Sequence, residues 1–255
     1  MIDHLSPSQI GMWMRCPKQW EFRYVKGLKV PPSGAMVLGS AYHGGLAGRF
    51  KYVLDRAAQP PPEYVTDIFD TEWQYLLNMG AMFDDEGENE QLPFDEIVWG
   101  DEDPGVLKDT GIRLLQAYEQ SIAPSIQPVT VEQKETLIVG DVPIVLVTDL
   151  TTPFATIDHK VKKKRFSEAE LQQSLQGTVY QMATGLPLEF HVALKQKTLA
   201  IDIQRTSRTG ADALWFTGQA QSVWQAVHAG VFVPNDQGWH CDPAWCGYWH
   251  LCKGR

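Results

Sequence analysis

The sequence predicts an α/β fold in which a mostly helical N-terminal part precedes a mixed sheet flanked by helices. Three observations predict it. Apolar residues recur every three or four positions through much of residues 6–121, which is the period of helices that bury one face. Residues 129–161 are rich in β-branched residues, which favour strands. Beyond residue 167, helical and strand patterns alternate, which is typical of an α/β or α+β core.

The N-terminal part predicts a series of helices. Ser6 supplies a capping hydroxyl and Pro7 is tolerated in a first turn, so a helix begins here and ends near Cys16. Residues 84–104 are acidic, contain Gly and Pro, and lack a period, so we expect a surface loop or insertion there. The other helices expected in this part cover residues 18–24, 35–57, 64–80 and 106–121.

The second half of the chain predicts the sheet. Residues 129–139 and 142–150 are separated by Gly-Asp, a hairpin signal, and residues 154–161 form a third strand. Ser167 and Glu170 form a capping box that opens a helix running to Thr184. Two further strands and a final helix are expected at residues 188–195, 198–204 and 209–229.

Charge is unevenly distributed along the chain. The net charge of −9 over 255 residues disfavours a general binder of polyanions, because phosphate backbones attract Lys and Arg. Between Glu63 and Asp109, however, 15 acidic residues face only Lys108, so the rest of the chain carries +5. We expect residues 60–105 to form an acidic insertion, cap or protein-partner surface within a single domain covering residues 1–255.

Membrane and secretory signals are not apparent in the sequence. No run of about 18 apolar residues occurs, so a membrane-spanning helix is not expected. The first residues, Met1–Pro7, lack the basic-then-apolar order of a secretory signal. We therefore expect a cytoplasmic protein with no membrane partner.

Two predicted strands carry a pattern of acidic and basic residues. Alternate side chains of a strand share a face, so Asp158 and Lys160 point together and His159 points away. An isolated D-x-K motif is usually a surface ion pair, but Asp149 ends the apolar strand nine residues upstream. Two carboxylates and an amine can then surround one Mg²⁺ or Mn²⁺ ion, which takes oxygen ligands. Such an ion activates water and neutralises charge in phosphodiester hydrolysis.

Three further residues are candidates for this site. Gln176 and Tyr180 lie four apart and hence on one helix face. They are either an ordinary helix surface or a polar pair directed at a phosphate. His43 lies on an otherwise apolar helical stretch with a glycine-rich flank, where a hydrogen-bonded core histidine is the commoner interpretation.

A basic run follows the D-x-K motif directly. Such a run is often only a solvated loop, but after a catalytic strand it could attract the DNA backbone through counterion release. The residues expected to contact nucleic acid are Lys162, Lys163, Lys164 and Arg165.

The four cysteines predict a metal or cluster site. Cys16 is distant, whereas Cys241, Cys246 and Cys252 have C-x4-C-x5-C spacing within the last 15 residues. In a cytosolic protein such a group indicates ligation before disulfides. Four thiolates suit an iron–sulfur cluster or Zn²⁺, and the spacing alone does not decide between them. Residues 239–255 would then be a cysteine-rich tail tied to Cys16.

The order of these motifs resembles the PD-(D/E)XK nuclease superfamily, and most closely its RecB-like branch with a four-cysteine iron–sulfur cluster. That branch includes CRISPR-associated RecB-like exonucleases and the nuclease domains of helicase–nucleases. The resemblance spans Leu5 to Cys252. It rests on Leu5-Ser6-Pro7-Ser8, Arg15-Cys16-Pro17, Phe22-Arg23-Tyr24, Gly39-Ser40-Ala41-Tyr42-His43, Glu132, Asp149, Asp158-x-Lys160, Gln176-x3-Tyr180 and the three C-terminal cysteines.

The resemblance implies a restriction-endonuclease-like core and a role for each motif. His43, Asp149 and Asp158 would bind the catalytic metal together with the backbone carbonyl of His159, and Lys160 would be the catalytic lysine. Gln176 and Tyr180 would be the Q-x3-Y pair of the family. A [4Fe–4S] cluster would be held by Cys16, Cys241, Cys246 and Cys252.

The sequence therefore predicts a metal-dependent deoxyribonuclease. We expect an exonuclease that hydrolyses single-stranded DNA or the ends of linear duplex DNA in recombination, repair or end processing. The alternative is a non-catalytic iron–sulfur or zinc DNA-binding subunit of a larger complex. A homo-oligomer is also open, since some relatives form rings and the sequence shows no interface.

Overall fold

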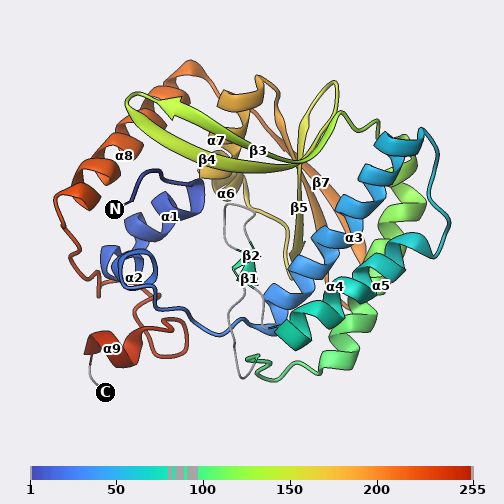
Figure 1. Ribbon diagram of the computed structural model, residues 1–255, viewed down its shortest axis with the longest axis horizontal. Helices are drawn as coiled ribbons and strands as arrows, with labels where there is room; N and C mark the ends of the chain where they lie inside the picture. The colour runs from blue at the N-terminus through green and yellow to red at the C-terminus, as the bar shows by residue number, and fades with distance from the viewer. Residues whose placement is uncertain (1, 80–81, 84–88, 91–96, 254–255) are drawn as a thin grey trace. The chain divides into compact units, whose positions relative to one another are not determined.

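The computed structural model describes residues 2–79, 82–83, 89–90 and 97–253 and is shown in Figure 1. The chain divides into two compact units. The terminal unit consists of Met1–Val30, Glu135–Leu146 and Thr209–Arg255, and the central unit of Pro31–Lys134 and Val147–Arg208. The expected single domain over residues 1–255 stays a prediction.

The elements follow the predicted order closely. The helices are α1 (Pro7–Arg15), α2 (Pro17–Trp20), the π-helical turn η1 (Glu21–Val25), α3 (Gly34–Arg56), α4 (Tyr64–Met79), α5 (Pro104–Ser121), the 3-10 turn η2 (Ala123–Ser125), α6 (Glu168–Gln172), α7 (Leu175–Thr184), α8 (Gly210–His228) and α9 (Trp249–Lys253). The strands are β1 (Met82–Phe83), β2 (Asn89–Glu90), β3 (Thr130–Val139), β4 (Val142–Thr151), β5 (Thr156–Lys162), β6 (Leu188–Leu194) and β7 (Ala200–Thr206).

The main sheet is mixed, which confirms the predicted α/β class. Its strand order is β3-β4-β5-β6-β7. The β4–β5 and β6–β7 pairs are antiparallel, whereas β5 and β6 are parallel and place His159 beside His191. Parallel neighbours need a crossover connection, and α6 and α7 supply it between β5 and β6.

The core of the central unit lies between helices and sheet. Helices α3, α4 and α5 pack on one another, α3 contacts β5, and α5 contacts β6 and β7 (Figure 1). The apolar side chains on one face of α3 are buried there, together with Phe69 and Trp73 of α4 and Tyr118 of α5. Arg49 is buried among them and donates to Glu119 at 2.8 Å, so the one charge has a partner of opposite sign.

The helix predicted from Ser167 to Thr184 is broken in two. The capping box of Ser167 and Glu170 is present, but α6 ends at Gln172 and Ser174 caps a second helix, α7. Serine competes with the backbone for hydrogen bonds, which makes it a poor interior residue and a good cap. The guanidinium of Arg208 donates to the carbonyls of Leu171 at 2.7 Å and Ser174 at 3.2 Å, and so satisfies the break.

Smaller differences concern loops. The third strand begins at Thr156 rather than residue 154, because Thr152 Oγ1 accepts from the Ala155 amide and turns the chain first. The short η2 and α9 were not expected. Strand β2 lies in the segment expected to be aperiodic and pairs antiparallel with β1, which precedes that segment, so that Met82 is opposite Glu90. The rest of the acidic stretch within residues 84–96 lies outside the described residues.

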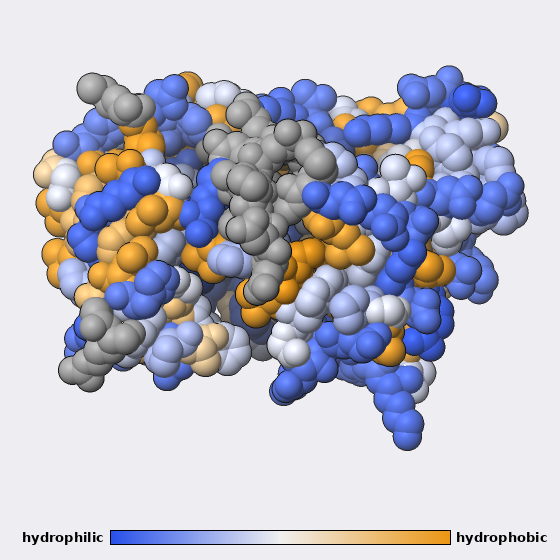
Figure 2. Space-filling model, turned by 60° about the horizontal axis from the view of Figure 1, so that its bottom comes forward, coloured by the Kyte–Doolittle hydropathy of each residue, from blue (hydrophilic) through white to orange (hydrophobic). Residues whose placement is uncertain are grey.

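The terminal unit brings the two ends of the chain together. Leu5 pairs with Ile144 through Leu5 N–Pro143 O and Val145 N–Leu5 O hydrogen bonds of 2.9 and 2.8 Å. Helix α1 packs on α8, and the Tyr248 hydroxyl donates to the Leu28 carbonyl at 2.8 Å. No helix in the described ranges is long and apolar enough to cross a membrane. On the face in Figure 2, exposed hydrophobic residues are scattered among hydrophilic ones.

Candidate active site

The acid and the lysine of the D-x-K motif form a partly buried ion pair on β5, in which the lysine side chain is 29% exposed. The Asp158 side chain is fully buried, and its oxygens lie 2.9 and 2.8 Å from Lys160 Nζ. Strand alternation places both side chains on one face, as predicted. Asp158 Oδ2 accepts no well-oriented hydrogen bond from the described residues, although it lies within ion-pair distance of Lys160 Nζ.

Asp149 occupies the adjacent strand and contacts two histidines. Its Oδ2 accepts from the backbone amide of His159 at 2.8 Å. The same oxygen lies 3.2 Å from Nδ1 of His43 on α3 and 3.6 Å from Nδ1 of His159. The structure therefore gathers Asp149, His43 and His159 in the central unit, although the three residues come from one helix and two strands.

The two aspartates have opposite electrostatic environments. Burial raises the pKa of Asp158 to about 6, and the attraction of Lys160 offsets this only in part. Burial acts in the same direction on Asp149, but His43 and the hydrogen bond from His159 outweigh it and hold its pKa well below the usual value. Two carboxylates with such different proton affinities, close together, are typical of functional sites.

The histidines also differ. Burial opposes the charged form of His43, but the negative charge of Asp149 outweighs it and raises the His43 pKa. Burial lowers the pKa of His159 to about 4, despite its contact with Asp149, so this ring is neutral at physiological pH. Its ring stacks on Phe50 at a centroid distance of 6.1 Å and is 2 % exposed.

The Q-x3-Y pair contacts the strand that carries Asp149. Gln176 Nε2 donates to the Tyr180 hydroxyl at 3.1 Å, and that hydroxyl donates to the Val147 carbonyl at 2.5 Å. Burial, with the charges of Asp158 and Asp149, raises the Tyr180 pKa well above its usual value, so the phenol is neutral. The pair therefore fixes α7 against β4 two residues before Asp149.

Glu132 is a site residue to which sequence reasoning gave no role. It lies on β3 with φ of +51°, a left-handed conformation that is strained for a residue with a side chain. The residue as a whole is exposed, but its carboxylate lies among protein atoms, and this burial together with the charge of Asp149 raises its pKa. Glu132 had appeared only as part of the resemblance, because no sequence pattern reports a local φ.

The basic run after β5 is largely paired with acids. Lys162 Nζ lies 3.3 Å above the centre of the Phe166 ring and 3.8 Å from Glu170. Lys163 is 3.7 Å from Glu102, and Arg165 is 3.4 Å from Asp202. Lys164 and Arg165 line an open groove together with acidic Glu168 and Glu170. The local positive charge is therefore smaller than the number of consecutive basic residues in the sequence indicates.

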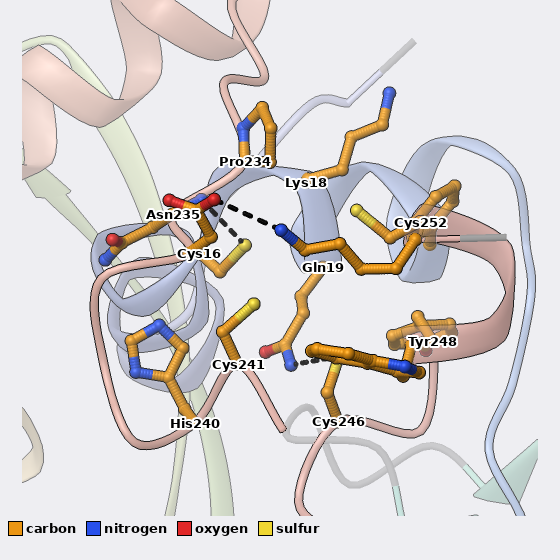
Figure 3. Close-up of a pocket in the computed structure, with 14 residues that line it drawn as sticks. Cys16, Lys18, Gln19, Pro234, Asn235, His240, Cys241, Cys246, Tyr248 and Cys252 are labelled. Carbon is orange, nitrogen blue, oxygen red and sulfur yellow. Dashed lines mark hydrogen bonds and ion pairs between the residues drawn. The ribbon is translucent and has the colours of Figure 1, made fainter. Parts of the chain in front are cut away.

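The four cysteines line one pocket of the terminal unit (Figure 3). All four thiols are free; Cys16 and Cys246 are buried, Cys241 is partly buried and Cys252 is exposed. Two sulfurs accept hydrogen bonds, Cys246 from Gln19 Nε2 at 3.1 Å and Cys16 from the Asn235 amide at 3.4 Å. The tail and Cys16 thus line the same pocket.

The described residues do not form a coordination sphere that is already arranged for a metal ion. Within the described parts of the chain, no group of three or more His, Cys, Asp or Glu residues is arranged to hold a metal ion. The donor atoms of both sites are instead engaged with neighbouring protein groups, such as Lys160 at Asp158 and Gln19 at Cys246. The chemistry of each donor set still fits its expected group: hard carboxylate oxygens in one, thiols in the other.

The central unit thus has a mixed sheet that carries a partly buried acid–lysine pair beside a second carboxylate. The model of the PD-(D/E)XK nuclease superfamily matches residues 4–253. The chain belongs to the PD-(D/E)XK nuclease superfamily, whose nucleases are hydrolytic and generally use Mg²⁺ or Mn²⁺.

Solved structures support the fold. A crystal structure of a protein from Eubacterium rectale, provisionally named an exonuclease, has a TM-score of 0.57 at 15% identity, covering 94% of this chain and 87% of that one. The crystal structure of SSO0001 covers 97% of this chain and 95% of its own at 10% identity, but its TM-score of 0.33 supports no argument. No curated protein sequence matches the chain.

Proposed function

We propose that the chain is a metal-dependent deoxyribonuclease, and specifically an exonuclease acting on single-stranded DNA or the ends of linear duplexes. The observation that carries the proposal is the partly buried Asp158–Lys160 pair beside Asp149. Burying a charged pair is costly, and its retention next to a second carboxylate is best explained by chemistry. The Eubacterium rectale structure supports the exonuclease choice by fold alone.

In this proposal each side chain has a distinct task. Asp158, Asp149 and His43, with the carbonyl of His159, would hold the divalent cation. When bound, the cation would neutralise charge on the phosphodiester and make a nearby water more acidic. Lys160 Nζ would orient the attacking water and stabilise negative charge that develops on the phosphate. Tyr180 and Gln176 would hold the strand of Asp149 in place.

The cysteine pocket is the second part of the proposal. We infer that Cys16, Cys241, Cys246 and Cys252 hold a [4Fe–4S] cluster, with Zn²⁺ as the alternative. The support is that four free thiols from both ends of the chain line one pocket and that two of them accept N–H hydrogen bonds. Hydrogen bonds to sulfur are among the means by which proteins tune such clusters.

The test compares active-site variants on labelled linear DNA with Mg²⁺ or Mn²⁺. Asp158→Ala and Lys160→Ala should each lower cleavage by at least about 100-fold, whereas Asp141→Ala, in the exposed β3–β4 turn, should leave it unchanged. If either active-site variant kept full metal-dependent cleavage, the assigned centre would be wrong. Degradation of linear but not circular DNA would identify an exonuclease. Binding without cleavage over a panel of metals would instead favour the non-catalytic subunit.

A further inference from the structure

A buried chain of polar side chains leads from Asp149 into the core of the central unit. His159 Nε2 lies 3.1 Å from the Tyr118 hydroxyl, which lies 2.7 Å from Nδ1 of His191. At the far end, His191 Nε2 is 3.3 Å from Glu189 Oε2. At the near end, His159 Nδ1 is 3.6 Å from Asp149. We call these five residues the buried polar chain; the nuclease chemistry described above uses only its first two members.

The fold brings these groups together by strand register and helix packing. His159 and His191 are direct partners on the parallel strands β5 and β6, and their rings meet at right angles with centroids 5.8 Å apart. Tyr118 enters from α5. The exposed fractions of the Tyr118, His159 and His191 residues are 0, 2 and 2 %. Polar groups buried this deeply are costly unless each is hydrogen-bonded, so the three constrain one another.

The protons in the buried polar chain can be counted. A neutral imidazole and a phenol carry one N–H or O–H each, and an ionised carboxylate only accepts. The hydrogen bond from His191, opposed by burial and aided by Arg205, lowers the pKa of Glu189, so its carboxylate is an acceptor. If each imidazole carries a single proton, three protons serve four contacts, and one contact must lack a proton.

The direction of the hydrogen bonds in the buried polar chain follows from the acceptor at its far end, Glu189. Glu189 requires a proton on Nε2 of His191, so His191 Nδ1 accepts from the Tyr118 hydroxyl. Tyr118 oxygen then accepts from Nε2–H of His159, and His159 Nδ1 is left without a proton. This nitrogen faces Asp149 in the longest of the four contacts, 3.6 Å, which exceeds a hydrogen bond. Asp149 accepts from the His159 backbone amide instead.

We propose that Tyr118 is a positioning residue of the nuclease centre, which fixes His159 as the Nε2–H tautomer and thereby orients the ring and peptide of His159 against Asp149. The proposal rests on the proposed function, because Asp149 and the carbonyl of residue 159 are expected metal ligands there. Groups that hold metal ligands from behind typically contribute 10- to 100-fold to metal affinity or activity.

The first experiment reverses the direction of the hydrogen bonds in the buried polar chain by changing Glu189 at its far end. In Glu189→Gln, the amide oxygen can still accept from Arg205, whose Nε lies 2.7 Å from Glu189 Oε1, while the amide N–H₂ faces His191 Nε2. His191 then donates to Tyr118, Tyr118 to His159 Nε2, and His159 carries its proton on Nδ1 toward Asp149. Each of the four contacts then has one proton between its two heavy atoms, so the reversed direction is favoured.

The readout is the long-range ¹H–¹⁵N correlation of the histidine rings in metal-free protein near neutral pH. We expect His159 of the unaltered protein to be the Nε2–H tautomer and that of Glu189→Gln to be the Nδ1–H tautomer. An Nδ1–H tautomer in the unaltered protein, or the same tautomer in both, would overturn the proposal. This result does not depend on catalysis.

The second experiment removes the central hydroxyl. Tyr118→Phe should weaken Mn²⁺ binding, measured by calorimetry, by about 10- to 100-fold and raise the Mn²⁺ needed for half-maximal cleavage equally. Tyr42→Phe is the matched control: Tyr42 is also fully buried, but its hydroxyl has no hydrogen-bond partner among the described residues. Its Mn²⁺ affinity should stay within about twofold. Equal affinities in the two variants would refute a positioning role for Tyr118.

Thermal denaturation of each variant separates positioning from unfolding. If Tyr118→Phe does not fold, Glu189→Gln still decides the tautomer. If the unaltered protein binds no Mn²⁺ and cleaves no DNA, the proposed function fails. In that case the ring correlations still show whether the buried polar chain orders His159, so the two failures are distinguishable.

Discussion

At the residue scale, Asp149 and Asp158 show how position alone gives two identical side chains different pKa values. Both are carboxylates in the central unit, but Asp149 has His43 at 3.2 Å and a backbone donor at 2.8 Å, whereas the ion-pair partner of Asp158 is Lys160. The pKa of the first lies well below the usual value and that of the second is raised to about 6. In the metal-free protein, ionised Asp149 therefore stabilises the fold and ionised Asp158 destabilises it.

The two asparagine variants should consequently shift stability in opposite directions. At pH 8 in a chelator, Asp158→Asn should raise the free energy of unfolding by roughly 1–3 kcal/mol, because it removes an acid whose folded pKa of about 6 exceeds the ordinary value of 3.8. Asp149→Asn should lower it. Urea denaturation measures both, and both variants should lose cleavage.

The pH dependence checks the sign for Asp158. Its destabilising effect is full above the folded pKa of about 6 and disappears as the pH falls toward 3.8, where the unfolded chain is protonated too. The advantage of Asp158→Asn should therefore shrink between pH 8 and pH 5. A variant less stable than the unaltered protein at pH 8 would show that Lys160 outweighs burial.

At the element scale, strand β3 is strained at Glu132. A left-handed φ of +51° costs a residue with a Cβ roughly 1–2 kcal/mol, whereas glycine adopts it freely. The strain persists beside Asp149, and strained residues gather at functional sites. We infer that Glu132 is present for the chemistry of its carboxylate and not for the stability of β3.

Glu132→Gly should therefore stabilise the fold and harm the reaction. We expect the free energy of unfolding to rise by up to about 1 kcal/mol and DNA cleavage to fall. The matched control is Glu135→Gly, three residues along the same strand and without positive φ, which should lower stability by about 0.5–1 kcal/mol. A loss of stability in both variants, measured by urea denaturation, would argue against strain at residue 132.

The helix break between α6 and α7 depends on a residue that is distant in the sequence. Residues 167–184 have the cap, length and ending of one helix, yet the chain breaks at Ser174. The break becomes favourable because Arg208, beyond the next two strands, donates to the carbonyls that it frees. The local sequence allowed either outcome, and a partner 34 positions from Ser174 decided between them.

At the scale of the whole molecule, the terminal unit joins the chain ends through the cysteine pocket. Cys16 lies at the start of α2, and the other three cysteines lie beyond α8. Even as free thiols they meet, because Asn235 bonds both Cys16 Sγ and the Arg15 carbonyl and Gln19 bonds Cys246. A ligand bound by all four would close a loop of more than 200 residues and so restrict the unfolded chain strongly.

Removing one thiol should therefore affect both colour and stability. Protein purified without oxygen should show broad visible absorbance, which Cys16→Ala should lose together with several degrees of melting temperature. His240→Ala, which lines the same pocket, should keep both. A Cys16→Ala protein that lost its colour but kept its melting temperature would refute the structural role, and a colourless zinc-loaded protein would replace the cluster with Zn²⁺.

What the sequence by itself determined were the features set by near neighbours. Strand alternation paired Asp158 with Lys160, hydroxyl caps began α1 and α6, and the order of motifs identified the superfamily. Only the tertiary structure brought Tyr118 to His159 and His191, which are 41 and 73 positions away, and turned Glu132 toward the charge of Asp149. The reason is physical: periodicity and capping act within a turn or a strand, whereas a buried hydrogen bond between distant residues depends on how the elements pack.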